Sequence, residues 1–130
     1  MEKSIADVID DIMQMIEVNQ LDDYLLRKAE YDLVNARRKD PDNPLSMYIG
    51  FSICHWRSNR GMALTYLEEL HDLTKSNDPK IFHNQPFSRE TVIKFLKDIR
   101  TPMLIDDVDT ISDLMIEMFE QISAFRCSCK

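Results

Sequence analysis

Apolar side chains recur three and four positions apart along most of the chain, and short polar breaks separate the runs. This period is typical of an α-helix that buries one side. Six helices are expected, over about residues 4–18, 21–39, 44–57, 62–74, 88–101 and 109–125. No segment alternates apolar and polar positions for long enough to predict a strand. The pattern therefore predicts an all-α fold.

Residues that favour helix ends mark several of these boundaries. Ser4–Asp7 matches the capping-box pattern, and Thr110–Asp113 repeats it at the sixth segment. Ser88 is expected to begin the fifth helix. Pro102 is expected to end that helix because proline interrupts the backbone hydrogen bonds. Most boundaries are thus predicted to within a few residues.

The connections between helices are mostly short, so neighbouring helices are expected to pack as antiparallel hairpins. The exception is residues 76–86, which contain two prolines. Two architectures satisfy this pattern, a compact helical bundle and a stack of three helix pairs. The length of 130 residues is close to the most common size of one domain. A single helical domain, residues 1–130, is therefore expected.

Composition and charge narrow the fold class and the environment. The two glycines, Gly50 and Gly61, are too few for the tight turns of a β-rich domain. No apolar run approaches the ~20 residues of a membrane-spanning helix, and the acidic residues near the N-terminus are unlike a secretory signal. Three cysteines do not suggest a disulfide framework and favour a reducing compartment. A cytoplasmic protein that does not associate with membranes is expected.

Several residues between positions 29 and 70 follow a known repeat pattern. Ala29, Leu33, Ala36 and Pro41 have the spacing of the second helix of a tetratricopeptide repeat, and Gly50 falls where its first helix has a small residue. This stretch therefore resembles part of a tetratricopeptide-repeat array, although residues 92–125 show no such signature. The resemblance implies stacked helical hairpins that act as a scaffold for binding another protein.

The resemblance also makes a prediction about packing. Ala29 and Ala63 occupy corresponding positions in the second helices of two successive pairs. Small residues at such positions allow two helices to approach closely. Both alanines are expected at close helix crossings.

The strongest candidate for a metal site combines two short segments. A zinc site needs four ligands such as thiolates and imidazoles, and Cys54, His55, Cys127 and Cys129 could supply them. However, Cys54 and His55 are adjacent on a helix and point in different directions, and Cys-x-Cys is narrower than the usual Cys-x-x-Cys. The alternative is one buried cysteine and two thiols near the end of the chain, and no metal is predicted.

Other residues that often carry catalysis lack the necessary arrangement. A nucleophilic Cys54 would need His71 or His83 as its base, and its apolar neighbours predict burial instead. The carboxylates of residues 7–11 and 106–113 are expected to be solvated near the N-termini of helices. No glycine-rich phosphate loop occurs. The chain is therefore predicted to be neither an enzyme nor dependent on a cofactor.

The third segment carries more large side chains than one apolar stripe requires. Met47, Tyr48 and Phe51 are not all explained by the stripe that includes Leu45 and Ile49. Surplus apolar surface of this kind often marks an interaction site, so these three residues are predicted to line a groove that binds a partner. The alternative is that the third helix is central and buried on all sides.

Basic residues are denser in one part of the chain than its net charge of −7 suggests. The basic group consists of Arg27, Lys28, Arg37, Arg38, Lys39, Arg57 and Arg60. Arg37 and Arg38, in particular, are predicted to contact an acidic partner. The alternative is that these charges complement the C-terminal ends of their helices. The overall negative charge works against nucleic-acid binding in either case.

Taken together, these features favour a non-enzymatic protein-binding module. It would be a small adaptor, chaperone or inhibitor that holds another polypeptide in a helix-lined groove. The partner is expected to be a protein, and a homodimer is one form of such an interaction. One alternative is an immunity- or antitoxin-like inhibitor whose acidic surface covers a basic enzyme. The other is a zinc-dependent protein that uses the four ligands above.

Overall fold

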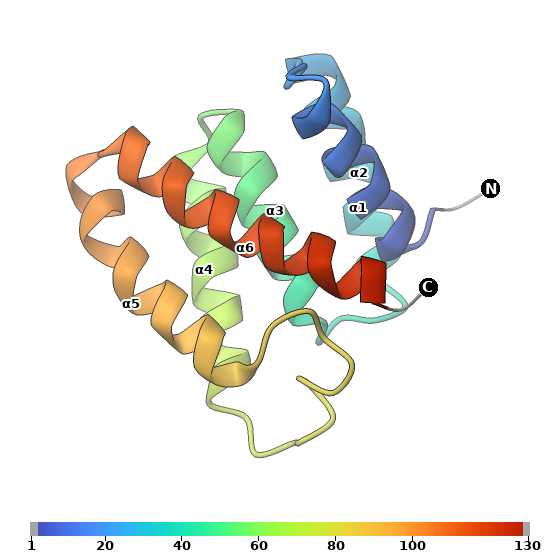
Figure 1. The fold of residues 1–130 in the computed structure, drawn as a ribbon, viewed down its shortest axis with the longest axis vertical. Coiled ribbons are helices and arrows are strands. Elements are labelled where there is room, and N and C mark those ends of the chain that lie inside the picture. The colour runs from blue at the N-terminus through green and yellow to red at the C-terminus, as the bar shows by residue number, and fades with distance from the viewer. Residues whose placement is uncertain (1–2, 129–130) are drawn as a thin grey trace. The chain divides into compact units, whose positions relative to one another are not determined.

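The computed structural model describes residues 3–128, and all of its regular structure in that range is α-helical (Figure 1). The six helices are α1 (Ile5–Glu17), α2 (Asp23–Arg37), α3 (Pro44–Trp56), α4 (Arg60–Thr74), α5 (Arg89–Ile105) and α6 (Val108–Ser128). No strand occurs within residues 3–128. The prediction of an all-α fold with six helices is confirmed.

The described chain divides into two compact units, residues 3–70 and residues 71–128, and the boundary falls within α4. In the first unit α2 packs against both α1 and α3, and in the second unit α5 packs against α6. A compact unit is defined by contacts and is not in itself a domain. The single domain and the tetratricopeptide-like stack therefore stay predictions.

Two of the expected helix starts are present with their capping bonds. The Asp7 amide donates to Ser4 Oγ at 3.2 Å, and the Ser4 amide donates to an Asp7 carboxylate oxygen at 3.0 Å. Together these bonds form the expected capping box of α1. The Ser88 hydroxyl accepts a hydrogen bond from the Thr91 amide at 3.2 Å and caps α5.

The expected capping box at Thr110–Asp113 is wrong. The Thr110 amide donates to the Asp107 carboxylate at 3.3 Å, and the Thr110 hydroxyl donates to the same group at 2.7 Å. Asp107 therefore satisfies the free amides at the start of α6, and Thr110 already lies inside the helix.

The prediction that Pro102 ends the fifth helix is also wrong, because α5 continues to Ile105. Because proline lacks only its own backbone N–H, α5 loses one hydrogen-bond donor at Pro102 and still continues for about one more turn. The Pro102 carbonyl accepts the amides of Asp106 and Asp107, and Asp106 has the left-handed backbone conformation (φ 57°) that ends the helix. Pro102 itself is buried.

Helix α3 is the most deeply buried part of the first unit. It contains no Asp, Glu, Lys or Arg between Pro44 and Trp56, and Ile49 and Ile53 are fully buried. Gly50 lies directly against the ring of Tyr66 on α4, because a Cβ at position 50 would overlap the ring carbons. The absence of a side chain at Gly50 therefore allows α3 and α4 to cross closely.

The two alanines expected at helix crossings are both in the interior. Ala29 on α2 is 3% exposed and Ala63 on α4 is fully buried. No helix within residues 3–128 is both long enough and apolar enough to cross a lipid bilayer.

In the second unit, Arg89 organises the long connection between α4 and α5. Its guanidinium donates to the backbone carbonyls of Thr74, Ser76 and Asp78 and lies 5.2 Å from the centroid of the Phe82 ring. One side chain thus satisfies three carbonyls of a segment without regular structure.

Candidate protein-binding groove

The three residues predicted to line a groove on α3 lie in the interior instead. Met47 is 5% exposed, and Tyr48 and Phe51 are fully buried. This burial matches the alternative in which the third helix is central, since its uncharged sequence leaves no side that water must solvate. Burial raises the pKa of Tyr48 well above the ordinary value for tyrosine. These side chains expose almost no surface to a partner in this structure.

Arg37 is engaged within the first unit. Its guanidinium donates to Glu69 at 2.8 Å and lies 5.2 Å from the centroid of the Tyr66 ring. The ring also contacts Gly50, so Arg37 extends the α3–α4 crossing through the aromatic side chain. Arg38, one residue further along, is exposed at the C-cap of α2. Only Arg38 of this predicted pair faces solvent.

Arg57 is also engaged within the first unit, where it connects α3 to α2. Its Nε lies 3.1 Å from Asp23, and one terminal nitrogen donates to Glu30 at 2.6 Å. The hydrogen bond with Asp23, followed by that with Glu30, raises the pKa of Arg57. The basic group predicted from the sequence thus includes arginines that hold helices together as well as arginines that face water.

A groove lies between α1 and α2, within the first unit, and its volume is about 330 Å³. Its apolar lining consists of Met15 on α1, Val18 directly after α1, and Leu25 and Ala29 on α2. The complete lining is Lys3, Asp11, Gln14, Met15, Val18, Gln20, Leu25, Lys28, Ala29 and Asp32. This volume lies at the lower end of the range of about 300–1,000 Å³ that is typical of ligand-binding clefts.

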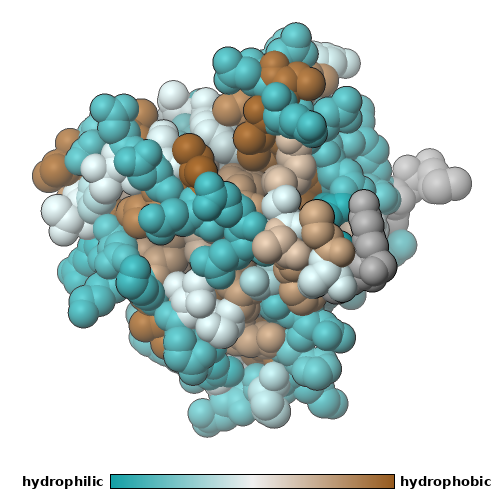
Figure 2. All heavy atoms as spheres, viewed as in Figure 1, coloured by the Kyte–Doolittle hydropathy of each residue, from teal (hydrophilic) through white to brown (hydrophobic). Residues whose placement is uncertain are grey.

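The turn between α1 and α2 extends this apolar surface. Val18 is 54% exposed, and Leu21 is also exposed. On the face drawn in Figure 2, hydrophobic atoms gather at this end of the two helices, among hydrophilic neighbours. Asn19, between them, has the left-handed backbone conformation (φ 54°) that commonly follows the end of a helix. The turn therefore leaves two exposed apolar residues, Val18 on the groove lining and Leu21 just before α2.

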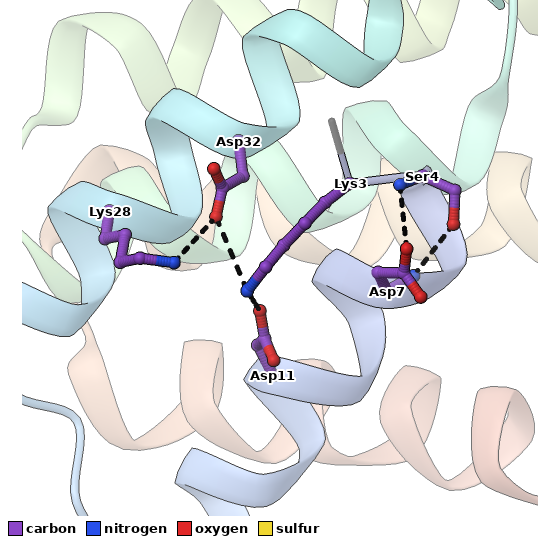
Figure 3. Close-up of polar contacts among 6 residues, drawn as sticks. All are labelled: Lys3, Ser4, Asp7, Asp11, Lys28 and Asp32. Atoms are coloured by element: carbon purple, nitrogen blue, oxygen red, sulfur yellow. Dashed lines mark hydrogen bonds and ion pairs between the residues drawn. The ribbon is translucent and has the colours of Figure 1, made fainter. Parts of the chain in front are cut away.

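Four charged side chains form a chain of ion pairs along the rim of the groove (Figure 3). Lys3 Nζ lies 2.6 Å from Asp11 and 3.7 Å from Asp32, and Lys28 Nζ lies 3.3 Å from Asp32. The hydrogen bond to Asp11 is the largest cause that raises the pKa of Lys3. Two positive and two negative charges balance, so the rim adds no net charge to the groove.

The side of α2 that faces away from the core adjoins this groove. The residues on this side begin at Tyr24 and follow it by three, four, seven, ten, eleven and fourteen positions, a spacing that keeps side chains on one side of a helix. We define this outer face of α2 as Tyr24, Arg27, Lys28, Tyr31, Val34, Asn35 and Arg38. Lys28 belongs to both surfaces, which makes them continuous. The outer face carries three basic residues and no acidic residue.

The acidic residues of α2 lie beside this face and are paired with basic groups. Asp23 pairs with Arg27 and Arg57, Glu30 pairs with Arg57, and Asp32 pairs with Lys28. Arg27 and Lys28, two of the three basic residues of the outer face, are therefore balanced by carboxylates at its edges.

The candidate zinc ligands are only partly within the described chain. Cys54 is buried on α3, His55 is half-buried beside it, Cys127 is exposed on α6, and Cys129 lies outside the described residues. Within residues 3–128, no group of three or more His, Cys, Asp or Glu side chains is arranged to hold a metal ion. The zinc hypothesis stays a prediction that metal analysis can test.

The environment of Cys54 is unsuited to nucleophilic chemistry. Burial is the main cause that raises the pKa of the Cys54 thiol to about 11, and nearby Glu30 adds to this effect. A thiol with this pKa is almost entirely protonated at neutral pH, whereas the thiolate is the nucleophile. His71 and His83, the candidate bases, are exposed residues of the second unit.

Comparisons with known proteins identify no relative. No protein-family model matches the chain, and searches of curated proteins and of solved structures find no match.

Neither the α1–α2 groove nor the outer face of α2 was predicted from the sequence. The outer face does leave a sequence signal, because Tyr24, Arg27, Tyr31 and Val34 repeat at spacings of three, four and three without an acidic residue among them. Such a stripe, opposite the stripe of Leu26 and Leu33 that enters the core, is unusual for a solvated helix side.

Proposed function

We propose that this protein is a non-enzymatic protein-binding module and that it holds a segment of another polypeptide in the α1–α2 groove. The observation that supports the proposal most strongly is the groove itself, which combines an apolar lining with a charge-balanced rim. Peptide grooves formed by two helices accept apolar anchor residues of a partner in this way.

The state of the groove residues favours binding over catalysis. Lys3, Asp11, Lys28 and Asp32 are paired with one another, which suits a stable rim better than proton transfer. Exposed Val18 on the groove lining, with exposed Leu21 in the turn that follows, provides apolar surface that a partner would cover.

Site-specific photo-crosslinking in cells that naturally contain the protein tests this proposal. A photoreactive amino acid replaces Gln14 or Val18, on the lining of the groove, and the control replaces Ile116, an exposed apolar residue of the second unit. We expect both groove positions to crosslink to the same polypeptide and position 116 not to do so. Equal crosslinking from all three positions, or none from the groove, would contradict the proposal. Circular dichroism verifies that each variant is folded.

The acidic-inhibitor alternative predicts a different result from the same experiment. An acidic surface that covers a basic enzyme would crosslink from positions next to exposed carboxylates rather than from the groove. Metal analysis of the purified protein tests the zinc-dependent alternative independently.

A further inference from the structure

We propose that the turn between α5 and α6 is a second docking surface and that it binds a basic amphipathic segment of another protein. The surface is centred on three exposed apolar residues, Leu104 and Ile105 at the end of α5 and Val108 at the start of α6, which we call the apolar tip. The tip belongs to the second unit and shares no residue with the α1–α2 groove. Binding at the tip therefore does not depend on the proposed function.

The apolar tip leaves large aliphatic side chains in water. Leu104 and Ile105 are 69% and 66% exposed, more than any other large aliphatic side chain within residues 3–128, and Val108 is 53% exposed. The three residues lie within five consecutive positions, so they are grouped at one turn. On the face drawn in Figure 2, hydrophobic atoms occur at this end of the α5–α6 hairpin among hydrophilic neighbours. Apolar residues that are grouped in this way mark interaction sites, whereas scattered ones do not.

Hydrogen bonds on both sides of the turn hold the apolar tip in place. The Pro102 carbonyl accepts the amides of Asp106 and Asp107. The Asp107 carboxylate in turn accepts hydrogen bonds from the amide and the hydroxyl of Thr110, inside α6. A surface that is already ordered loses little conformational entropy when a partner binds. The turn therefore presents its apolar residues without first having to fold.

The charge around the tip indicates the chemistry of the partner. Residues 101–125 contain six acidic residues and no Lys, Arg or His. Asp106 and Asp109, which are interspersed with the apolar residues, are exposed, and neither forms an ion pair with another residue of the described range. Cations of a partner can therefore pair with these carboxylates without displacing an existing ion pair. The same charge opposes binding of a second copy of the tip or of a nucleic acid.

A basic amphipathic segment satisfies both features of the turn. Its apolar side chains would cover Leu104, Ile105 and Val108, and lysines or arginines beside them would face Asp106 and Asp109. Complementary charge around an apolar centre gives such a contact its specificity and makes association faster at low salt. The tip is small, so apolar residues from about two turns of a helical partner are sufficient to cover it.

Calorimetric titration of the full-length protein with synthetic peptides tests this inference. The probe is an amphipathic peptide of about 18 residues, or five helical turns, with leucines at helical spacing and lysines elsewhere. The two controls replace every lysine by glutamine or by glutamate. We expect the lysine peptide to bind at least about tenfold more tightly than either control, and more weakly at high salt.

The first pair of variants tests the apolar residues without changing the net charge. The variant Leu104→Gln/Ile105→Gln/Val108→Gln should weaken binding of the lysine peptide at least about tenfold. Its matched control replaces three exposed apolar residues elsewhere and should bind as the native protein does. This control is Leu64→Gln/Ile93→Gln/Ile116→Gln. Circular dichroism verifies that both variants are folded.

The second pair of variants tests the carboxylates and leaves the capping residue Asp107 in place. The variant Asp106→Asn/Asp109→Asn should weaken binding at least about threefold more than its control. Asparagine tolerates the left-handed conformation of residue 106, so the turn should persist. The control, Glu117→Gln/Glu120→Gln, changes the net charge equally but further along α6.

Several outcomes would overturn the inference. Equal binding of the three peptides, or binding of none, would refute a basic partner. Equal weakening by the tip variants and by their controls would show that the net charge of −7 attracts the peptide without a defined site. Dissociation of a dimer by the apolar variant, measured by analytical ultracentrifugation, would assign the tip to a contact between two copies. Failure of the groove proposal is recognised separately, by crosslinking from positions 14 and 18.

Discussion

Helices α2 and α3 are neighbours in the same unit, and each carries aromatic residues outside a simple apolar stripe. On α3 the side chain of Tyr48 is fully buried, whereas Tyr31 on α2 is 69% exposed. The difference follows from the surrounding charges. Helix α3 has no Asp, Glu, Lys or Arg, but charged residues occur along the whole length of α2. Charged side chains must remain solvated or paired, so they hold one side of α2 at the surface.

This comparison shows why surplus aromatic residues alone do not locate a binding site. On an uncharged helix the surplus enters the core, as at Phe51. On a helix with charges on its flanks, the surplus remains in water, where a partner can use it. We therefore distinguish α3, a core helix, from α2, a presenting helix.

The largest expected difference concerns the aromatic residues themselves. Phe51→Ala should lower the free energy of unfolding by about 3–5 kcal/mol, because it removes a fully buried ring. Tyr31→Ala should change it by less than about 0.5 kcal/mol, because its ring is mostly in water. Urea denaturation monitored by circular dichroism measures both values. Similar losses for the two variants would refute the division between α2 and α3.

The next difference concerns the two glycines. Gly50→Ala should destabilise the protein by about 1–3 kcal/mol, because its new Cβ would meet the Tyr66 ring. Gly61→Ala is the matched control: no atom lies within 4 Å of the added Cβ, and alanine favours a helix by up to about 1 kcal/mol. Thermal or urea denaturation gives both values. A stabilising Gly50→Ala would show that α3 and α4 do not cross closely at this residue.

The buried character of α3 also predicts slow reaction of Cys54. In the variant Cys127→Ser/Cys129→Ser this thiol is the only one present. With a pKa near 11, roughly one thiol in a thousand is ionised at pH 8. A thiol reagent should therefore modify the native variant far more slowly than the same variant in denaturant. Equal rates in the two conditions would mean that α3 is accessible to solvent.

The smallest expected effect concerns the start of α1, beside the groove. Hydrogen bonding by the Ser4 amide lowers the pKa of Asp7 below its ordinary value of 3.8. The carboxylate therefore stabilises the folded state above the unfolded pKa, and this contribution is lost as pH falls through the folded pKa. The stability difference between the native protein and Asp7→Asn should be present at about pH 6 and shrink below about pH 4. A difference that is independent of pH would exclude this capping bond.

Local sequence signals predicted the helices well because these signals act over a few residues. Ser4 and Ser88 cap their helices as expected, since a hydroxyl and a nearby amide are sufficient for the bond. The end of α5 was mispredicted because tertiary packing buries Pro102 and the helix continues for one more turn. Thr110 was mispredicted because a stronger capping acceptor, Asp107, precedes it.

The candidate site was harder to predict because it depends on contacts between residues far apart in the sequence. Arg37 and Arg38 are adjacent, yet the first packs on Tyr66 and Glu69 while the second faces water. Likewise, Lys3 reaches Asp32 across the groove, and no local pattern indicates this pair. The sequence did indicate a basic region on the second helix, but the inward or outward direction of each side chain required the fold.

Nuclear magnetic resonance with the polypeptide captured by crosslinking from the groove tests the central claim most directly. The amide resonances of the protein are recorded during titration with that polypeptide. We expect the largest shifts along α1 and the groove side of α2, at residues such as Gln14, Val18 and Lys28, and small shifts at Tyr48 and Phe51 of α3. Shifts concentrated on α3, or on α5 and α6, would contradict the assignment of α2 as the presenting helix and α3 as the core.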